Sequence, residues 1–152
     1  MRDDERKKHN KMCVRFDSLP ENEGFARMVV SAFMTGTNPT LEEVSDVKTA
    51  VSEAVTNCVI HGYEHRVGEI EISADISGRT LHIEVKDWGK GIEDVKLAME
   101  PLFTTKPEED RSGMGFSFME AFMDRIEVES YVGEGTVINM WKEIGTTIPR
   151  YE

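Results

Sequence analysis

Two neighbouring segments in which apolar and polar residues alternate most tightly constrain what this chain can fold into. Residues 69–76 (EIEISADI) and 80–86 (TLHIEVK) place an apolar side chain at every second position, which is the period of a β-strand. Ser77-Gly78-Arg79 between them has the composition of a hairpin turn. Because each strand has only one apolar face, the pair is predicted to form an antiparallel hairpin in a sheet covered on one side.

Two segments that precede the hairpin have the periodicity of helices. In residues 20–34 the positions that recur at helical spacing, and are predicted to be buried, are Phe25, Met28, Val29, Ala32 and Phe33. A second helix is predicted to follow Thr40, which forms a capping box with Glu43, and to end at Gly62. Its predicted inward face consists of Leu41, Val44, Val47, Val51, Val55 and Cys58.

The remaining segments complete a single domain. A strand is predicted near residues 12–18, a short helix near 93–99, a helix at 114–124 and two closing strands at 126–131 and 136–141. This order predicts an α+β fold, a two-layer α/β sandwich with helices on one face of a mostly antiparallel sheet. Three parts are expected: a flexible charged tail at 1–11, the domain at 12–143 and a C-terminal tail at 144–152.

Composition narrows the compartment and the partners. The 152 residues carry 18 Lys and Arg against 29 Asp and Glu, a net charge of -11, which disfavours nucleic acid and favours a protein partner with a basic surface. Cys13 and Cys58 lie in apolar segments and are predicted to be core thiols in a reducing compartment. No apolar stretch follows the charged N-terminus, so neither a signal peptide nor a membrane span is expected, and the predicted location is cytoplasmic.

A row of polar residues on the second helix raises the question of function. Glu53, Asn57 and His61 follow one another at spacings of four. Glu53 and Asn57 are about 40° apart on a helical wheel, on the side opposite the valines. The wheel alone favours a solvated face, with His61 as a cation that stabilises the helix end.

Two glycine motifs lie after the hairpin. Asp87, Gly89 and Gly91 directly follow a strand, where glycines let the backbone approach a flat ligand and the carboxylate can accept a hydrogen bond from an amine. The same pattern also forms an ordinary strand-to-helix turn. Gly113 and Gly115 open a helix whose amides suit phosphates, although glycine is also a tolerated N-cap.

The segment from Pro101 to Ser112 is long and polar, and it is either a functional lid or a floppy connection. It contains Lys106 and Arg111, which can bind negatively charged oxygens. In combination these features predict a nucleotide site. Asp87 would read the base, Asn57 would hold a metal ion between phosphates, and Glu53 would act on a hydroxyl or water.

Three motifs also carry a family resemblance. The stretches EAVTN, DWGKG and RSGMGF resemble the N, G1 and G2 boxes of the GHKL, or Bergerat-fold, ATPases and kinases. The lid and following helix (EPLFTTKPEEDRSGMGFSFMEAFMD), with ENEGFAR and SEAVTNCVIHGY, resemble the anti-sigma serine kinases, and among them the sporulation anti-sigma F group. The resemblance covers about Val14 to Trp141.

The resemblance implies a role for each matching residue. Glu53 would be the general base and Asn57 a Mg²⁺ ligand, while Asp87 would bind the adenine amine of ATP or ADP in a pocket shaped by Gly89 and Gly91. The lid would contain Thr104, Thr105 and Lys106. The triphosphate would be lined by Arg111, which is also counted among the catalytic residues, and by Gly113, Met114 and Gly115.

The resemblance also implies the partners. The protein would be a homodimer that inhibits a sigma factor of the sigma F type, with Arg27 in the contact, and an ATP-dependent kinase of a serine on an anti-anti-sigma protein. A stress-response anti-sigma kinase and a nucleotide-gated binding module with little kinase activity remain alternatives. A Walker-type kinase is disfavoured because GxxxxGK[ST] is absent, and a eukaryotic-type kinase because there is no HRD loop. A complete histidine kinase would need a phosphoacceptor helix pair before the ATP domain. The residues before the Asn57 motif are predicted to form one strand and two helices, so the chain would be at most a detached catalytic domain of such a kinase.

Overall fold

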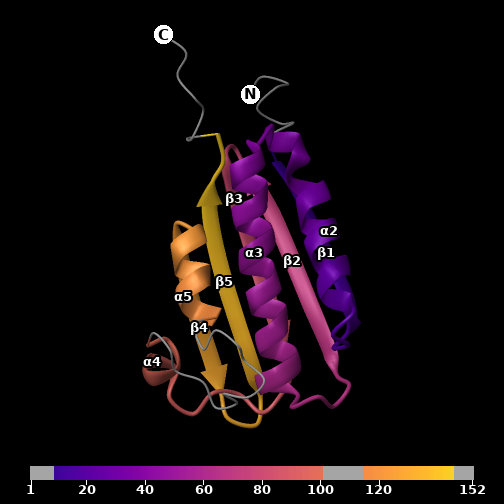
Figure 1. Ribbon diagram of the computed structural model, residues 1–152, viewed down its shortest axis with the longest axis vertical. Helices are drawn as coiled ribbons and strands as arrows, with labels where there is room; N and C mark the ends of the chain where they lie inside the picture. The colour runs from indigo at the N-terminus through magenta and orange to yellow at the C-terminus, as the bar shows by residue number, and fades with distance from the viewer. Residues whose placement is uncertain (1–8, 101–114, 146–152) are drawn as a thin grey trace.

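The predicted two-layer α+β fold is confirmed by the computed structural model, which describes residues 9–100 and 115–145. Helices α2, α3 and α5 lie on one face of a five-stranded sheet (Figure 1). In chain order the elements are β1 (His9–Asp17), α2 (Asn22–Met34), η1 (Thr35–Thr37), α3 (Leu41–Asn57), η2 (Cys58–Gly62), β2 (Glu69–Ser77), β3 (Thr80–Asp87), α4 (Val95–Ala98), α5 (Gly115–Phe122), β4 (Arg125–Tyr131) and β5 (Gly135–Glu143).

The sheet has the strand order β1-β2-β3-β5-β4, and every neighbouring pair is antiparallel. The predicted hairpin is confirmed, since Ser77 pairs with Thr80 and Gly78 has the positive φ of 64° that a tight turn requires. Because β5 lies between β3 and β4, the end of β3 meets the turn that joins β4 to β5. This arrangement brings the Asp87 end of β3 beside residues from the far end of the chain.

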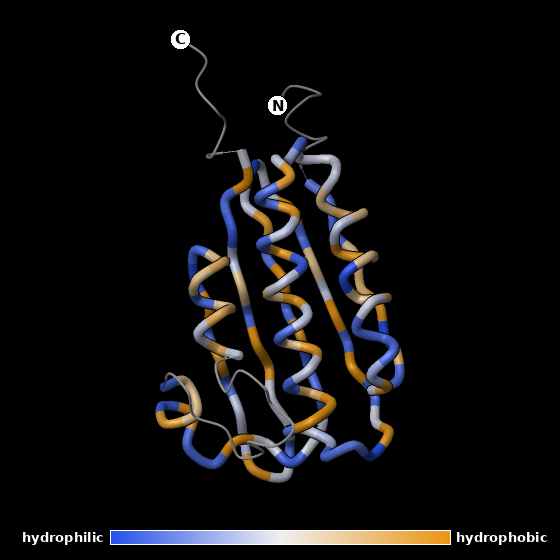
Figure 2. Tube along the Cα trace, viewed as in Figure 1, coloured by the Kyte–Doolittle hydropathy of each residue, from blue (hydrophilic) through white to orange (hydrophobic). Residues whose placement is uncertain are grey.

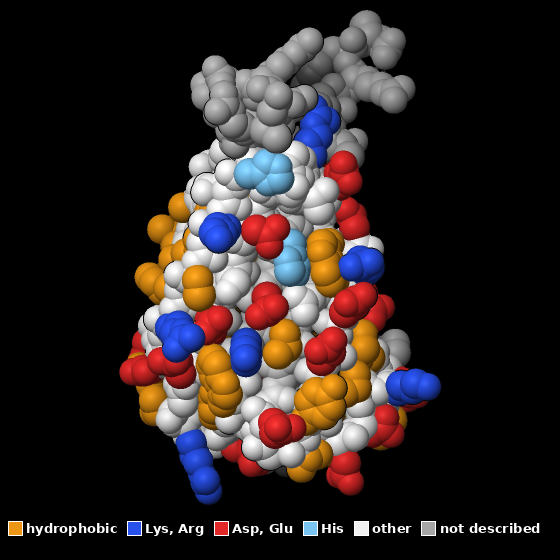
Figure 3. Space-filling model, turned by 180° about the vertical axis from the view of Figure 1, so that it is seen from behind, with side chains coloured by type: hydrophobic (Ala, Val, Ile, Leu, Met, Phe, Trp, Pro, Cys, Tyr) orange, Lys and Arg blue, Asp and Glu red, His pale blue; other side chains and the backbone are white. Residues whose placement is uncertain are grey.

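The sheet has one apolar face and one polar face, as the alternation predicted. Along β2 and β3 the buried residues that face the helices are Ile70, Ile72, Ala74, Ile76, Leu81, Ile83 and Val85. Figure 2 shows the matching alternation of hydrophobic and hydrophilic residues along the strands. Seen from behind, the sheet carries acidic, basic and histidine side chains between scattered apolar ones (Figure 3).

One row of side chains crosses this open face. His82 lies with its Nδ1 3.0 Å from Asp75 Oδ2, and its ring stacks on Trp141 with 4.7 Å between centroids. The Arg125 guanidinium lies 3.9 Å from the Trp141 ring centroid on the neighbouring strand. Cross-strand pairs of this kind stabilise a sheet without needing a covering layer.

Helix α3 begins as predicted, but its predicted inward face is partly wrong. The capping box of Thr40 and Glu43 is present, and Val47, Val51, Val55 and Cys58 are buried. Leu41, however, is 90% exposed, because it lies in the first turn of the helix, beyond the packed layer. After Asn57 the helix widens into the one-turn π-helix η2, which ends at Gly62.

The predicted buried face of α2 is also largely wrong, although Phe33 is half-buried and packs against the core. The residues buried in α2 are Ala26, Val30 and Met34, whereas Phe25 and Met28 are 45% and 67% exposed. Helix α2 packs mainly on α3, so the stripe that contains Ala26 and Val30 is covered. The outer side of α2 has no covering element among the described residues.

The folded region extends past both predicted boundaries. Strand β1 begins at His9, three residues before the predicted start of the domain. Ile144 is fully buried, and the Gly145 N–H donates to Glu43 Oε2 at 2.8 Å. Cys13 is exposed on the edge strand β1, so its predicted place in the core is wrong, whereas Cys58 is buried as predicted. Among the described residues, the structure has no helix that is both long and apolar enough to span a membrane.

Candidate functional site

The C-terminal part of α3 meets the N-terminal end of α5 at one edge of the helical layer. A Cβ atom built on Gly115, the first residue of α5, would lie 3.3 Å from Asn57 Nδ2 and 3.4 Å from Glu53 Oε2. Both side chains are half-buried. Three of the predicted site residues, Glu53, Asn57 and Gly115, are therefore brought together, and the wheel-only interpretation of a solvated face does not describe them.

Asn57 carries the clearest sign of a binding function. Its Nδ2 atom is buried and has no hydrogen-bond acceptor among the residues that the structure describes. A buried donor without an acceptor is destabilising by about 1–3 kcal/mol, and native proteins rarely retain one without a reason. The amide faces the first residue of α5, where backbone N–H groups favour negatively charged ligand atoms.

Asp87, the last residue of β3, forms the second part of the site. Its side chain is only 4% exposed. Its Oδ1 accepts a hydrogen bond from the Gly89 N–H at 2.9 Å, and it is also hydrogen-bonded to the thiol of Cys58. Burial raises the pKa of Asp87, although the hydrogen bonds from Gly89 and Cys58 oppose the shift. Such a carboxylate can accept a hydrogen bond from an amine of a flat ring.

Cys58 was predicted only as a core thiol, and its contact with Asp87 was not predicted. Cys58 begins the π-helix η2 and is 1% exposed. Its pKa is well above the usual value because it is buried and because the negative charge of Asp87 lies beside it. It stays a neutral thiol that can donate to the carboxylate. The pairing joins two positions that are distant in sequence, so no local pattern could have revealed it.

Glycines let three backbone segments approach one another around Asp87. A Cβ on Gly62 would lie 2.9 Å from Asp87 Oδ2, and one on Gly89 would lie 2.2 Å from the Gly62 carbonyl oxygen. A Cβ on Gly91, which has a positive φ of 79°, would lie 2.3 Å from the Tyr131 carbonyl oxygen. Gly89 and Gly91 were predicted to shape a pocket, and here they allow close contact between η2, the β3–α4 loop and the β4–β5 turn.

Tyr63 fixes the loop that carries Trp88. Its hydroxyl donates to the Glu69 carbonyl at 2.5 Å and accepts from the Trp88 N–H at 2.8 Å. A Cβ on Gly68 would lie 2.3 Å from the Tyr63 ring, so the ring packs directly on backbone. Burial raises the pKa of Tyr63, and the hydroxyl stays protonated for both contacts. In the sequence, the signal for this residue is its place directly after Gly62.

The other predicted residues are distributed as follows. Arg27 on α2 lies with Nη1 3.4 Å from both Glu23 Oε1 and Ser52 Oγ, beside a groove of about 620 Å³ that also reaches Glu53. His61 is half-buried in η2. The predicted residues that lie outside the described part of the chain are Thr104, Thr105, Lys106, Arg111, Gly113 and Met114.

The donor atoms of the site fit a magnesium ion bound together with phosphates. No group of three His, Cys, Asp or Glu side chains suited to a metal occurs in the described residues. Mg²⁺ is commonly held by one or two protein oxygens, with phosphate oxygens and water completing an octahedron. The oxygen of Asn57 can supply one such ligand, while its orphaned Nδ2 can donate to a phosphate oxygen.

Comparison with known proteins places this geometry in a family. The family model described as "Histidine kinase-like ATPase domain" matches residues 16–142. An anti-sigma F factor of Thermoanaerobacter sp. (strain X514) is 58% identical over 137 residues, which cover 90% of this chain and 96% of that protein. An anti-sigma F factor of Clostridium acetobutylicum is 56% identical over 134 residues, which cover 88% and 94%.

A solved structure agrees at the level of the fold. The crystal structure of the RsbU and RsbW domains of a Mycobacterium tuberculosis protein superposes with a TM-score of 0.64 at 17% identity, over 89% of this chain and 32% of that one. The expected GHKL-type fold is thereby confirmed. The sequence identities of 58% and 56% show the family as well as the fold. The chain belongs to the anti-sigma F factor family, within the histidine kinase-like ATPase domains.

Proposed function

We propose that this protein is an ATP-dependent serine kinase as well as an anti-sigma factor. It would inhibit a sigma factor of the sigma F type and phosphorylate a serine of the anti-anti-sigma protein that opposes it. The observation that carries the proposal is the meeting of Glu53, Asn57 and Gly115 at one point. Phosphoryl transfer depends on positioning and on neutralising charge, to which a carboxylate base, an amide that would hold Mg²⁺ and a helix N-terminus would each contribute.

The nucleotide would lie between the two parts of the site. Asp87 would accept a hydrogen bond from the adenine amine, with Gly89 and Gly91 shaping the pocket. Gly113, Met114 and Gly115 would line the triphosphate, together with Arg111 and the lid residues Thr104, Thr105 and Lys106. Mg²⁺, held through Asn57, would neutralise charge on the phosphates.

The transfer itself needs one proton acceptor. Glu53 would accept the proton of the substrate serine hydroxyl as the serine oxygen bonds to the γ-phosphorus. The bond from the γ-phosphorus to the bridging oxygen breaks, and ADP leaves with the electron pair. Arg111 would stabilise the charge that develops on the transferred oxygens.

The names of the relatives and the charge of the chain support the proposed sigma factor partner. The relatives at 56% and 58% identity are named anti-sigma F factors, which supports a sigma factor as the partner. Arg27, which is half-buried and lines the groove between α2 and α3, is the proposed contact, and a homodimer is the proposed assembly. A net charge of -11 suits a partner with basic surfaces, so added salt would weaken the complex.

The test uses labelled ATP. The purified protein is incubated with γ-labelled ATP, Mg²⁺ and a candidate anti-anti-sigma protein, and the label on serine is followed. Glu53→Gln is expected to lower the rate of transfer at least about a hundredfold while ADP affinity is retained. The matched control is Glu42→Gln, which removes a carboxylate from the exposed first turn of the same helix.

Two results would change the conclusion. Transfer by the Glu53→Gln variant at the wild-type rate would show that another group is the base. Nucleotide binding by the wild type without transfer to any candidate would favour the alternative, a module in which the nucleotide only sets the affinity for a sigma factor.

A further inference from the structure

A lysine lies on the apolar face of β5. Side chains of this strand alternate, and Ile138 and Met140, with Ile144 directly after the strand, are buried against the helices. Lys142 occupies the same face and is 9% exposed. A buried ammonium group is costly unless it is paired and hydrogen-bonded, so this position needs a physical reason.

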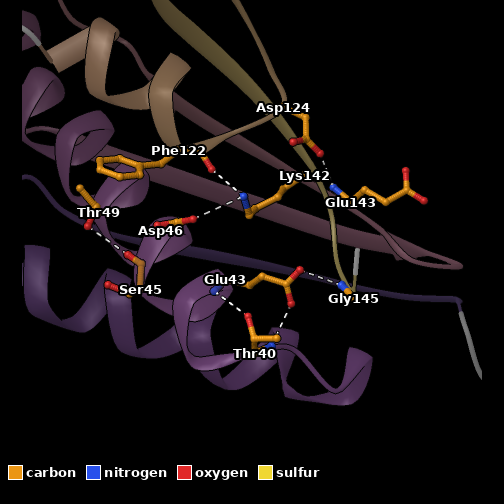
Figure 4. Close-up of polar contacts among 10 residues, drawn as sticks. All are labelled: Thr40, Glu43, Ser45, Asp46, Thr49, Phe122, Asp124, Lys142, Glu143 and Gly145. Carbon is orange, nitrogen blue, oxygen red and sulfur yellow. Dashed lines mark hydrogen bonds and ion pairs between the residues drawn. The ribbon is translucent and has the colours of Figure 1, made fainter. Parts of the chain in front are cut away.

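The ammonium group joins two helices. Lys142 Nζ donates to the Phe122 carbonyl oxygen at 2.8 Å and lies 3.7 Å from Asp46 Oδ2 (Figure 4). Phe122 is the last residue of α5, where carbonyl groups lack helical donors and a positive charge is favoured. Asp46 lies on α3. The cation therefore binds the C-terminal end of α5 to α3.

The other end of α5 lies at the proposed catalytic site. Gly115 lies beside Asn57 and Glu53, which also lie on α3, and a Cβ built on it would contact both side chains. The eight residues of α5 span about 12 Å, and Asp46 and Asn57 are about 16 Å apart along α3 at 1.5 Å per residue. Helix α5 thus runs antiparallel beside α3 (Figure 1) and is attached to it at both ends.

We propose that Lys142 is a positioning residue for phosphoryl transfer. Its contacts with Phe122 and Asp46 fix α5 along its axis, and this holds Gly115 against Asn57 and Glu53. The role rests on the proposed kinase function and goes beyond it, because Lys142 binds the end of α5 that is opposite the proposed catalytic site. A methionine would fill the same volume without the need to desolvate a charge, so what the lysine adds is a directed tie between two helices.

The first test does not depend on catalysis. Hydrogen exchange is measured by mass spectrometry on the wild-type protein and on Lys142→Met. We expect amides of residues 119–123 to exchange about tenfold faster in the variant, while the β2–β3 hairpin is unchanged, because the released helix end opens locally. The matched control is Lys11→Met, which removes an exposed strand lysine.

The second test separates positioning from general stability. Lys142→Met is expected to lower the transfer rate per folded molecule about tenfold and to change the dissociation constant of ADP less than about twofold, since Asp87 is held by β3 and η2. Lys142→Arg keeps the cation and should restore the rate to within about threefold. Asp46→Asn provides a second variant that loses the charge pair.

Several outcomes would overturn the proposal. Unchanged exchange in α5, wild-type transfer by Lys142→Met, or an equal loss of ADP affinity and transfer would each do so. If Lys142→Met does not fold, the same measurements on Asp46→Asn decide. Absence of transfer in the wild type would instead contradict the kinase function, and the exchange experiment would still show whether Lys142 positions α5.

Discussion

The two ends of the proposed nucleotide site are built in opposite ways. At the base end, around Asp87, donors and acceptors are already matched: its carboxylate accepts from Gly89, and Tyr63 bridges Trp88 and Glu69. At the phosphate end, the buried Nδ2 of Asn57 has no acceptor among the described residues. The hydrogen bonds of the base end are therefore formed without a ligand, whereas the phosphate end retains one buried donor without an acceptor in the described part of the chain.

This difference suggests different tasks for the two ends: the Asp87 end would recognise the base, and the Asn57 end would take part in the chemistry. A preformed base end binds its ligand with little loss of conformational entropy. At the phosphate end Glu53, Asn57 and Gly115 already lie together, and an oxygen of the proposed nucleotide would supply the acceptor that Asn57 Nδ2 lacks within residues 9–100 and 115–145.

The largest expected effect breaks the preformed end. In Gly89→Ala the new Cβ would lie 2.2 Å from the Gly62 carbonyl oxygen, and backbone cannot move away as a side chain can. We expect a loss of more than about 3 kcal/mol in the free energy of unfolding, measured by urea denaturation, with ADP binding lost in calorimetry.

Gly36→Ala is the matched control for this variant. No atom lies within 4 Å of a Cβ built there, so stability should rise by about 0.5 kcal/mol through the unfolded chain. Equal stabilities of the two alanine variants would mean that η2 shifts easily and that the base end is not preformed.

A smaller effect is expected at the phosphate end. Asn57→Ala should weaken Mg-ATP binding by about 10–100-fold, while metal-free ADP binding changes much less. The free energy of unfolding should stay within about 1 kcal/mol of wild type, because the packing lost with the side chain is offset by removal of a buried donor that had no acceptor among the described residues. Both affinities are measured by calorimetry with and without chelator.

Asn139→Ala serves as the control, since this asparagine contacts His82 on the open face of the sheet. Equal losses of Mg-ATP and metal-free ADP affinity in Asn57→Ala would assign Asn57 a structural role. The contrast between the two ends would then disappear.

Much of the fold could be predicted from the sequence because its signals are local. The β2–β3 hairpin follows from alternation, and the start of α3 follows from Thr40 and Glu43, which contact each other across three residues. The buried face of α2 could not be predicted in this way. That helix has apolar residues on two sides, and the choice between them depends on where α3 packs.

The residues of the candidate site also divide into those with a local sequence signal and those whose role depends on tertiary structure. Glu53, Asn57 and Asp87 could be selected because each belongs to a recognisable motif. Cys58 and Lys142 could not, because their partners are set by tertiary structure: Cys58 meets Asp87 where β3 ends, and Lys142 meets Phe122 across the helical layer. Only the apolar alternation of β5, which Lys142 interrupts, offered a signal.

The smallest expected effect sharpens the comparison through pH. Burial raises the pKa of Asp87 in the folded protein, so the folded state holds this proton more tightly than the unfolded state. The contribution of Asp87 to stability is therefore fully present below the unfolded pKa and is lost as pH rises through the folded pKa. Without nucleotide, Asp87→Asn should then be more stable than wild type at pH 7, and this advantage should shrink toward pH 4. The measurement is urea unfolding at both pH values. A stability advantage of Asp87→Asn that does not change with pH would show that ionisation of Asp87 does not destabilise the folded protein.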